Sequence, residues 1–70
     1  MIDRTGQVWE DEDGALIYLV VRTKLFKGLI FVHHVLYLYA DSEGFNAGEL
    51  SNDFEKVERP WEETARRRLL

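Results

Sequence analysis

Two segments of the chain, Ala15–Thr23 and Leu29–Ala40, decide most of what this sequence can fold into. Both are rich in Val, Ile, Leu, Phe and Tyr, and between them they contain one charged residue, Arg22. β-Branched and aromatic residues favour β-strands, so we expect both segments to be strands. The second would span twelve residues, about twice the usual five or six. A bend or bulge near His33 and His34 would let so long a strand serve two parts of a curled sheet.

Both predicted strands are apolar on both of their faces. In an antiparallel strand with one face in water, polar and apolar residues alternate, but here Tyr18 and Val20 would face one side while Ile17 and Leu19 face the other. A small sheet cannot cover two apolar faces by itself, so either the C-terminal segment or a second copy of the chain must cover one. We predict a homo-oligomer, most simply an isologous dimer. The alternative is a tightly curled monomeric barrel whose outer Tyr and His side chains stay partly in water.

Turn signals separate these strands from shorter elements. Asp11–Gly14 ends in an Asp-Gly pair between two extended segments, which is a strong hairpin signal, so Gly6–Glu10 is predicted to be a short strand. Phe45–Ser51 is predicted to be a weaker strand or a loop, with an irregularity at Gly48. Two further turns are expected, at Lys24–Gly28 and Asp41–Gly44.

The C-terminal third carries helix signals. Asn52, with a Glu three residues later, has capping-box spacing and predicts one helical turn over Phe54–Val57. Pro60 suits the first position of a second helix, and the apolar residues of Trp61–Leu69 recur every four positions, so we expect that helix there. The alternative is a last strand over Thr64–Leu70, because a closed barrel needs one.

Composition narrows the class of protein. The 70 residues fit one small domain, 1–70, and 46% of them are hydrophobic, enough to fold. There is no cysteine, and therefore no disulfide framework, thiolate nucleophile or Cys-based zinc site. The start of the sequence lacks the pattern of a signal peptide, and the longest uncharged stretch, residues 28–40, is too short to span a membrane. We therefore expect a cytoplasmic protein with no membrane partner.

Charge argues against a general nucleic-acid binder. The formal net charge is −4, whereas phosphate attraction dominates nucleic-acid affinity. A local basic patch is still conceivable, because basic residues gather in the centre and near the end of the chain. The candidates for such a patch are Arg22, Lys24, Lys27, Arg66, Arg67 and Arg68.

No set of catalytic or metal-binding residues stands out. Adjacent strand residues point to opposite faces, so His33 and His34 cannot chelate one metal in a regular strand. Asp11–Gly14 lacks the ligand spacing of a calcium loop, and Ser42 and Ser51 have no partner signal for nucleophilic catalysis. We expect no enzyme activity, no metal and no cofactor. One histidine is predicted in the core and one at an interface, which would make association depend on pH.

Aromatic and histidine side chains are the candidates for a partner or dimer surface. They have the character of a peptide-binding groove on a small barrel, although aromatic residues in so short a chain usually form the core. The set comprises Trp9, Tyr18, Phe31, His33, His34, Tyr37, Tyr39 and Trp61.

Four motifs carry a resemblance to known proteins: residues 6–10 (Gly-Gln-Val-Trp-Glu), 18–21 (Tyr-Leu-Val-Val), 34–36 (His-Val-Leu) and 60–62 (Pro-Trp-Glu). Together they resemble small SH3-like β-barrel proteins, most of all short accessory proteins of bacteriophages of actinobacteria. The opening Gly-x-Val-Trp is also similar to the start of ribonuclease toxins of toxin–antitoxin systems. Those toxins are longer, and this chain lacks their later catalytic segments, so their activity does not carry over.

These observations combine into one expected fold and three functional hypotheses. The fold class is mainly β: a small antiparallel, strongly bent sheet or an SH3-like barrel of four to five strands with a short C-terminal helix. The leading hypothesis is a non-enzymatic interaction module that self-associates and binds a protein partner, which the phage resemblance implies is a host protein. The alternatives are a nucleic-acid-associated barrel that uses the basic residues and a toxin-like ribonuclease relative.

Overall fold

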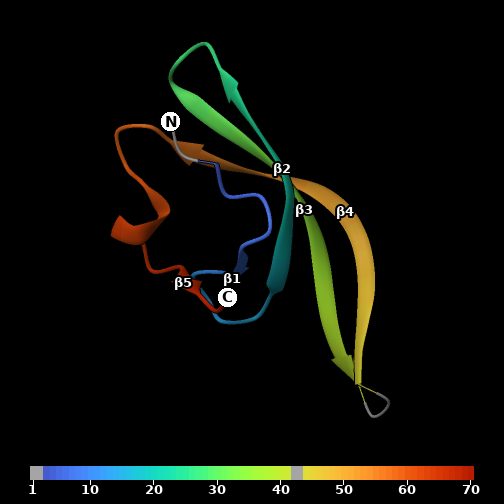
Figure 1. The fold of residues 1–70 in the computed structure, drawn as a ribbon. Helices are drawn as coiled ribbons and strands as arrows, with labels where there is room; N and C mark the ends of the chain where they lie inside the picture. The colour runs from blue at the N-terminus through green and yellow to red at the C-terminus, as the bar shows by residue number, and fades with distance from the viewer. Residues whose placement is uncertain (1–2, 42–43) are drawn as a thin grey trace.

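The fold is a single antiparallel sheet with almost no helix. The computed structural model describes residues 3–41 and 44–70, and its sheet has the strand order β4-β3-β2-β1-β5 (Figure 1). Within these residues β4 and β5 form the two edges of an open sheet. Of the two expected arrangements, the structure therefore has the bent sheet and not the closed barrel. The expectation of a mainly β, antiparallel fold is confirmed. The elements are β1 (Val8–Glu10), β2 (Ile17–Phe26), β3 (Ile30–Asp41), β4 (Gly44–Lys56), the 3₁₀ turn η1 (Trp61–Glu63) and β5 (Arg67–Arg68).

Both predicted central strands are confirmed, and both turns around β2 have clear local causes. In the first turn the Asp11 carboxylate accepts hydrogen bonds from the backbone N–H groups of Ala15 and Leu16. The β2–β3 turn is tighter than the expected Lys24–Gly28, because β2 continues to Phe26. Lys27 and Gly28 both have positive φ, 52° and 68°, which is the backbone of a type I′ hairpin turn.

The sheet bends where two strands each carry an extra residue. One register shift lies between Val20 and Arg22, where β2 has the extra residue. The other lies opposite Leu36–Leu38 of β3, where β4 has the extra residue. The first bulge lies on β2, beside the expected bend at His33–His34 but on the neighbouring strand. The second places Gly48 and its neighbour opposite one residue of β3, so the irregularity predicted at Gly48 is confirmed. Figure 1 shows β4 curving along its length.

The predicted helical turn over Phe54–Val57 is wrong. β4 extends to Lys56, with Phe54 opposite Val32 and Glu55 opposite Phe31. A helix cap stabilises a helix by only about 1 kcal/mol, whereas the pairing of β4 with β3 adds a long ladder of hydrogen bonds and places apolar side chains on the sheet.

The predicted helix over Trp61–Leu69 is also wrong, and its strand alternative is closer to the structure. Helical geometry ends after Glu63, and Thr64 is extended. The chain then forms β5, which pairs with β1, and Leu69 donates a hydrogen bond to the carbonyl of Val8. So short a helix is marginal in water, while the extended chain gains sheet hydrogen bonds.

The N-terminal and C-terminal segments pack against the same face of the sheet. We call this the inner face and the opposite one the outer face. The core on the inner face has Trp9 and Trp61 in edge-to-face contact, with ring centroids 5.2 Å apart. Tyr18 packs edge-to-face on Trp61 at 5.8 Å. Aromatic pairs of this kind add about 0.5–1.5 kcal/mol each beyond the area that they bury, and here they join both ends of the chain to β2.

Candidate interaction surface

The inner face is covered, and a charged cluster lies within it. Arg4 is 1% exposed and Glu55 is 2% exposed. The Arg4 guanidinium donates two hydrogen bonds to the Glu55 carboxylate, of 2.7 Å from Nε and 2.6 Å from Nη2, and both Nη atoms also donate to Glu62. Burial is the largest single effect on the pKa of Arg4 and acts to lower it. The hydrogen bonds and charges of Glu55 and Glu62 together outweigh burial, so the pKa of Arg4 is raised.

His33 belongs to the same cluster. Its Nε2 donates to Glu55 Oε1 at 2.7 Å, and its Nδ1 lies 2.9 Å from the hydroxyl of Thr23. Burial, opposed by the hydrogen bond to Glu55, lowers the pKa of His33. Burial also acts to raise the pKa of Glu55, but hydrogen bonds from Arg4, from the Trp61 N–H and from His33 together lower it. His33 is therefore a core histidine that is hydrogen-bonded to a buried carboxylate.

A second arginine, Arg66, also packs on the Trp61 ring. The Arg66 guanidinium lies 5.2 Å from the ring centroid. It donates to the Tyr18 hydroxyl at 3.2 Å, to Glu12 at 3.0 Å and to Asp53 at 3.4 Å. These contacts tie the segment after η1 to β2, β4 and the first turn, so Arg66 has a structural role.

The outer face of the sheet carries rows of apolar side chains. Directly opposite residues of antiparallel strands share a face, so the register places Leu19, Leu36 and Leu50 in one row. Ile17 and Leu38 form the next row towards one end, and Val32 with Phe54 and Phe26 with Ile30 form two rows towards the other. Between the two sets lies a polar row of Arg22, His34 and Asn52.

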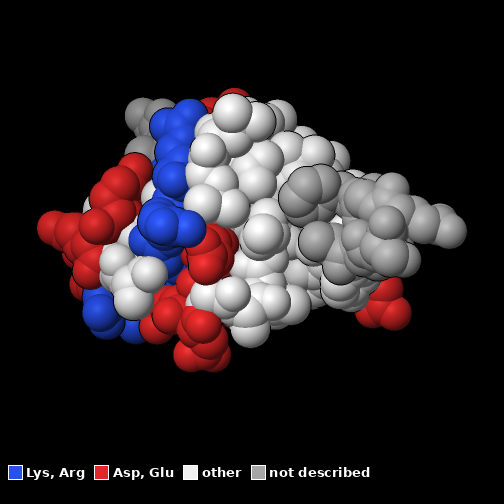
Figure 2. All heavy atoms as spheres, turned by 90° about the horizontal axis from the view of Figure 1, so that it is seen from below, with Lys and Arg blue, Asp and Glu red and all other residues white. Residues whose placement is uncertain are grey.

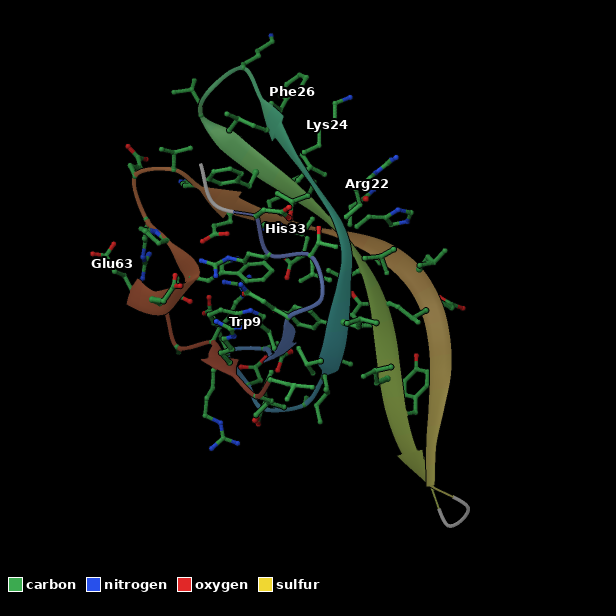
Figure 3. The ribbon with its side chains drawn as sticks, in the orientation of Figure 1. Trp9, Arg22, Lys24, Phe26, His33 and Glu63 are labelled. Carbon is green, nitrogen blue, oxygen red and sulfur yellow. The ribbon has the colours of Figure 1, made fainter. Side chains whose placement is uncertain are left out.

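The side chains of the outer face are only partly covered within the described residues. Leu50 is 58% exposed, Phe54 59% and Phe26 51%, and the apolar residues of the central strands are half-buried rather than buried. Both chain ends pack on the other side: Figure 3 shows Arg22, Lys24 and Phe26 pointing away from Trp9 and His33. Exposed apolar patches of several strands are typical of interaction sites.

Five of the eight aromatic and histidine candidates lie in the interior. Trp9, Tyr18, Phe31, His33 and Trp61 are buried on the inner face. Tyr37 is half-buried beside that core, packing edge-to-face on Tyr18, and Tyr39 is 48% exposed near the far end of β3. Of the expected partner surface, His34 alone lies on the outer face. The prediction that the two histidines point to opposite faces is confirmed.

The six basic candidates do not form one patch. Arg22 and Lys24 lie on the outer face and Lys27 lies at the β2–β3 turn, whereas the C-terminal arginines follow η1. Arg67 pairs with Glu10 at 2.8 Å, and Arg68 donates to the carbonyl of Leu70. Seen from below, Lys and Arg side chains lie among acidic ones over the side of η1 and β5 (Figure 2).

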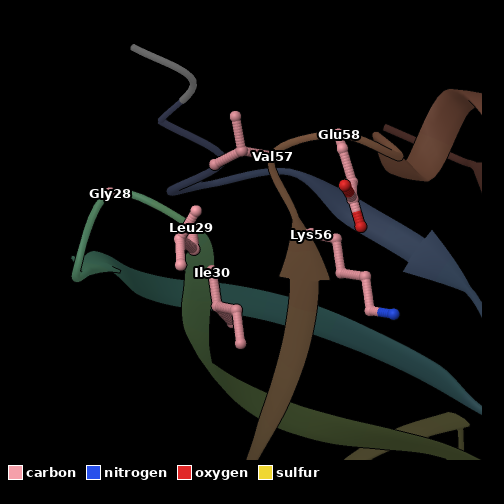
Figure 4. Close-up of a pocket in the computed structure, with 6 residues that line it drawn as sticks. All are labelled: Gly28, Leu29, Ile30, Lys56, Val57 and Glu58. Atoms are coloured by element: carbon pink, nitrogen blue, oxygen red, sulfur yellow. The ribbon is translucent and has the colours of Figure 1, made fainter.

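A hollow of about 390 Å³ lies between the β2–β3 turn and the end of β4 (Figure 4). Its apolar walls include Leu29 and Val57, which are 68% and 46% exposed. Its titratable side chains are those of Lys56 and Glu58, and it contains no Ser, Thr or His. The hollow therefore offers no hydroxyl or imidazole side chain.

The residues that organise the two faces could not be identified from the sequence. Arg4 and Glu55 stand 51 positions apart, so no local pattern links them. Leu50 and Phe54 stand four positions apart with three polar residues between them. This spacing fits a helix as well as a strand, so it could not have identified the outer edge of the face.

Among residues 3–41 and 44–70, no group of three or more His, Asp or Glu side chains is placed to hold a metal ion. Over the same described ranges, no helix has the length and apolar character needed to cross a bilayer.

The motifs behind the sequence resemblance lie in separate parts of the fold. Residues 6–10 lead into and form β1, residues 18–21 lie in β2, residues 34–36 lie in β3, and residues 60–62 enter η1. The relation to SH3-like barrels and to phage proteins stays a prediction. Comparison of the chain with protein-family models, with curated proteins and with solved structures finds no match.

Proposed function

We propose that this chain is a non-enzymatic interaction module that self-associates through the outer face of its sheet. The observation that carries the proposal is the row of Leu19, Leu36 and Leu50. Three adjacent strands present this row on a face that the described residues of neither chain end cover. Burial of apolar surface is worth about 25 cal/mol per Å². A second copy that covers these rows would therefore stabilise both chains.

A second copy fits this face in size. A standard interface buries about 800 Å² on each partner, and the molecule extends 42 × 21 × 16 Å along its principal axes. An isologous contact centred on the leucine row would stack two sheets about 10 Å apart. Arg22 lies in the polar row next to the leucine row, so the contact would extend from the leucines towards Ile17 and Leu38 and would leave Arg22 and Lys24 in water at its edge.

The charge arrangement supports self-association over nucleic-acid binding. Arg66 and Arg67 already pair with acidic side chains of the same chain, and the net charge is −4. A different protein with an apolar surface is the alternative occupant. In that case the chain would be a phage accessory protein that binds a host protein in the cytoplasm.

The proposal is tested by placing a charge in the leucine row and measuring the mass in solution by light scattering. Leu50→Glu should weaken self-association by about tenfold or more, because each copy would have to bury a carboxylate. Leu29→Glu is the control, since Leu29 is also exposed, at 68% against 58% for Leu50, but lies in the hollow beside the β2–β3 turn. Equal effects of the two substitutions would exclude the outer face as the interface.

A further inference from the structure

Before Gly6, the described part of the N-terminal segment contacts the sheet mainly through the Arg4 side chain. Asp3 and Thr5 are exposed, whereas Arg4 between them is 1% exposed. The Arg4 backbone N–H donates to the Thr23 hydroxyl at 3.3 Å, and the next backbone contact with β2 comes from the Gly6 N–H. Gly6 has a φ of 88°, and the space around its Cα is open. Gly6 and Gln7 form backbone hydrogen bonds with Val20, and the Gln7 N–H donates to the Arg4 carbonyl. Arg4 is therefore carried on a short strap, residues 3–5, that turns at Gly6.

The groups around the Arg4 guanidinium match the chemistry of that cation. Two carboxylates, Glu55 and Glu62, each bind it in bidentate fashion, and the amide oxygen of Gln7 accepts a further hydrogen bond of 3.2 Å. The guanidinium carbon lies 4.8 Å from the centroid of the Trp9 ring and 5.3 Å from that of Trp61. Planar forks of donors fit carboxylates in this way, and arginine stacks on aromatic faces, which a lysine ammonium does only in part.

Removal of the cation would leave an unbalanced site. The Glu55 side chain is fully buried, and the Glu62 side chain, at 61% exposure, leaves a route to solvent. Two carboxylates without their cation, one of them out of water, would attract a replacement strongly.

We propose that the inner face holds a guanidinium-binding site, filled in this chain by its own Arg4 and able to take the arginine side chain of another chain when the strap leaves. The site is distinct from the outer face and does not depend on self-association there. Its ligand class is a planar guanidinium, selected by the fork of carboxylates and by the tryptophan rings.

The test empties the site and supplies the ligand from solution. Arg4→Ala is titrated with millimolar methylguanidinium chloride, and thermal unfolding is followed by circular dichroism. Above the dissociation constant, each tenfold rise in methylguanidinium should raise the Tm of the variant by about 5 °C or more. Methylammonium chloride at the same concentrations should leave the Tm unchanged, and the native chain should respond to neither salt.

Two controls make the result decisive. Arg4→Ala combined with Glu62→Gln should need a higher methylguanidinium concentration for the same shift, because one carboxylate of the site is neutral. An Arg4→Ala chain that is unfolded in buffer is titrated in sucrose, which favours the compact state. Equal responses to methylguanidinium and methylammonium, or no response of the folded variant to either, would overturn the proposal.

Discussion

His33 Nε2 lies 2.7 Å from Glu55 Oε1, and neither side chain has any contact with solvent. The two residues come from β3 and β4, and Glu55 also accepts hydrogen bonds from Arg4 and from the backbone of Trp61. This one carboxylate thus connects the N-terminal segment, the sheet and the start of η1. The covered inner face depends on it, while the outer face of the described residues stays partly exposed.

Acid should destabilise the fold in two stages. The lowered pKa of His33, caused first by burial, means that the unfolded chain takes up a proton that the folded chain resists. Stability is therefore complete above the ordinary value of 6.5 and falls as the pH drops below it. The lowered pKa values of Glu55 and Glu62 add a second loss below 4.5. Urea unfolding at pH 8, 6 and 4 measures both.

Replacement of His33 should remove the first of these stages. His33→Gln keeps an N–H donor for Glu55 but does not titrate, so its stability should be flat between pH 8 and 6. His34→Gln, on the outer face, is the matched control and should keep the native slope. A native slope in His33→Gln would show that another group is responsible.

Loss of the Glu55 carboxylate should be far more costly than loss of the Glu62 carboxylate. Glu55→Ala leaves Arg4 buried without its main partner, and breaking a buried pair costs about 3–5 kcal/mol. Glu62→Ala removes a largely exposed partner of the same arginine, which is worth about 1 kcal/mol or less. Chemical denaturation of both variants gives the two values. Similar losses would mean that burial does not set the strength of these pairs.

Gly48 should resist substitution because of Tyr39. A Cβ atom at Gly48 would lie 2.1 Å from Cε2 of the Tyr39 ring, so Gly48→Ala forces the ring to move and should cost about 1 kcal/mol. The cost should disappear in a Tyr39→Ala background, because the obstacle is gone. Additive effects in this double-mutant cycle would contradict the close approach.

The turn at Lys27 should accept a better residue. Lys27 has a φ of 52°, and Asn or Gly at that position of a type I′ turn is favoured. Lys27→Asn should stabilise the fold by about 0.5 kcal/mol, whereas Gly28→Ala should destabilise it, since Gly28 also has positive φ. Thermal unfolding of both variants measures the contrast, and stabilisation by Gly28→Ala would exclude the type I′ assignment.

Features set by local sequence preference could be predicted, whereas features set by contacts between distant parts of the chain could not. Ala15–Thr23 and Leu29–Ala40 were predictable as strands because local preference and tertiary packing favour the same conformation. The helix signals at Asn52 and along Trp61–Leu69 are worth tenths of a kcal/mol to about 1 kcal/mol each, and long-range pairing with β3 and β1 outweighed them. Arg4 could not be linked with Glu55, since only the folded sheet brings them together.

The sequence predicted more apolar surface than one small sheet can cover, but not which face of the sheet would stay exposed. Both faces of the central strands are apolar in sequence, and the sequence contains no sign of which face the chain ends cover. The register places Val20 and Val35 on one face and Leu19 and Leu36 on the other. The described residues of the chain ends cover the face of Val20 and Val35, and the face of Leu19 and Leu36 stays partly exposed.

The solution mass of the native chain tests the central claim most directly. Sedimentation equilibrium over a range of concentrations should show a species of twice the 8.3 kDa chain mass, in reversible exchange with the monomer. A strict monomer up to millimolar concentration would contradict self-association through the outer face.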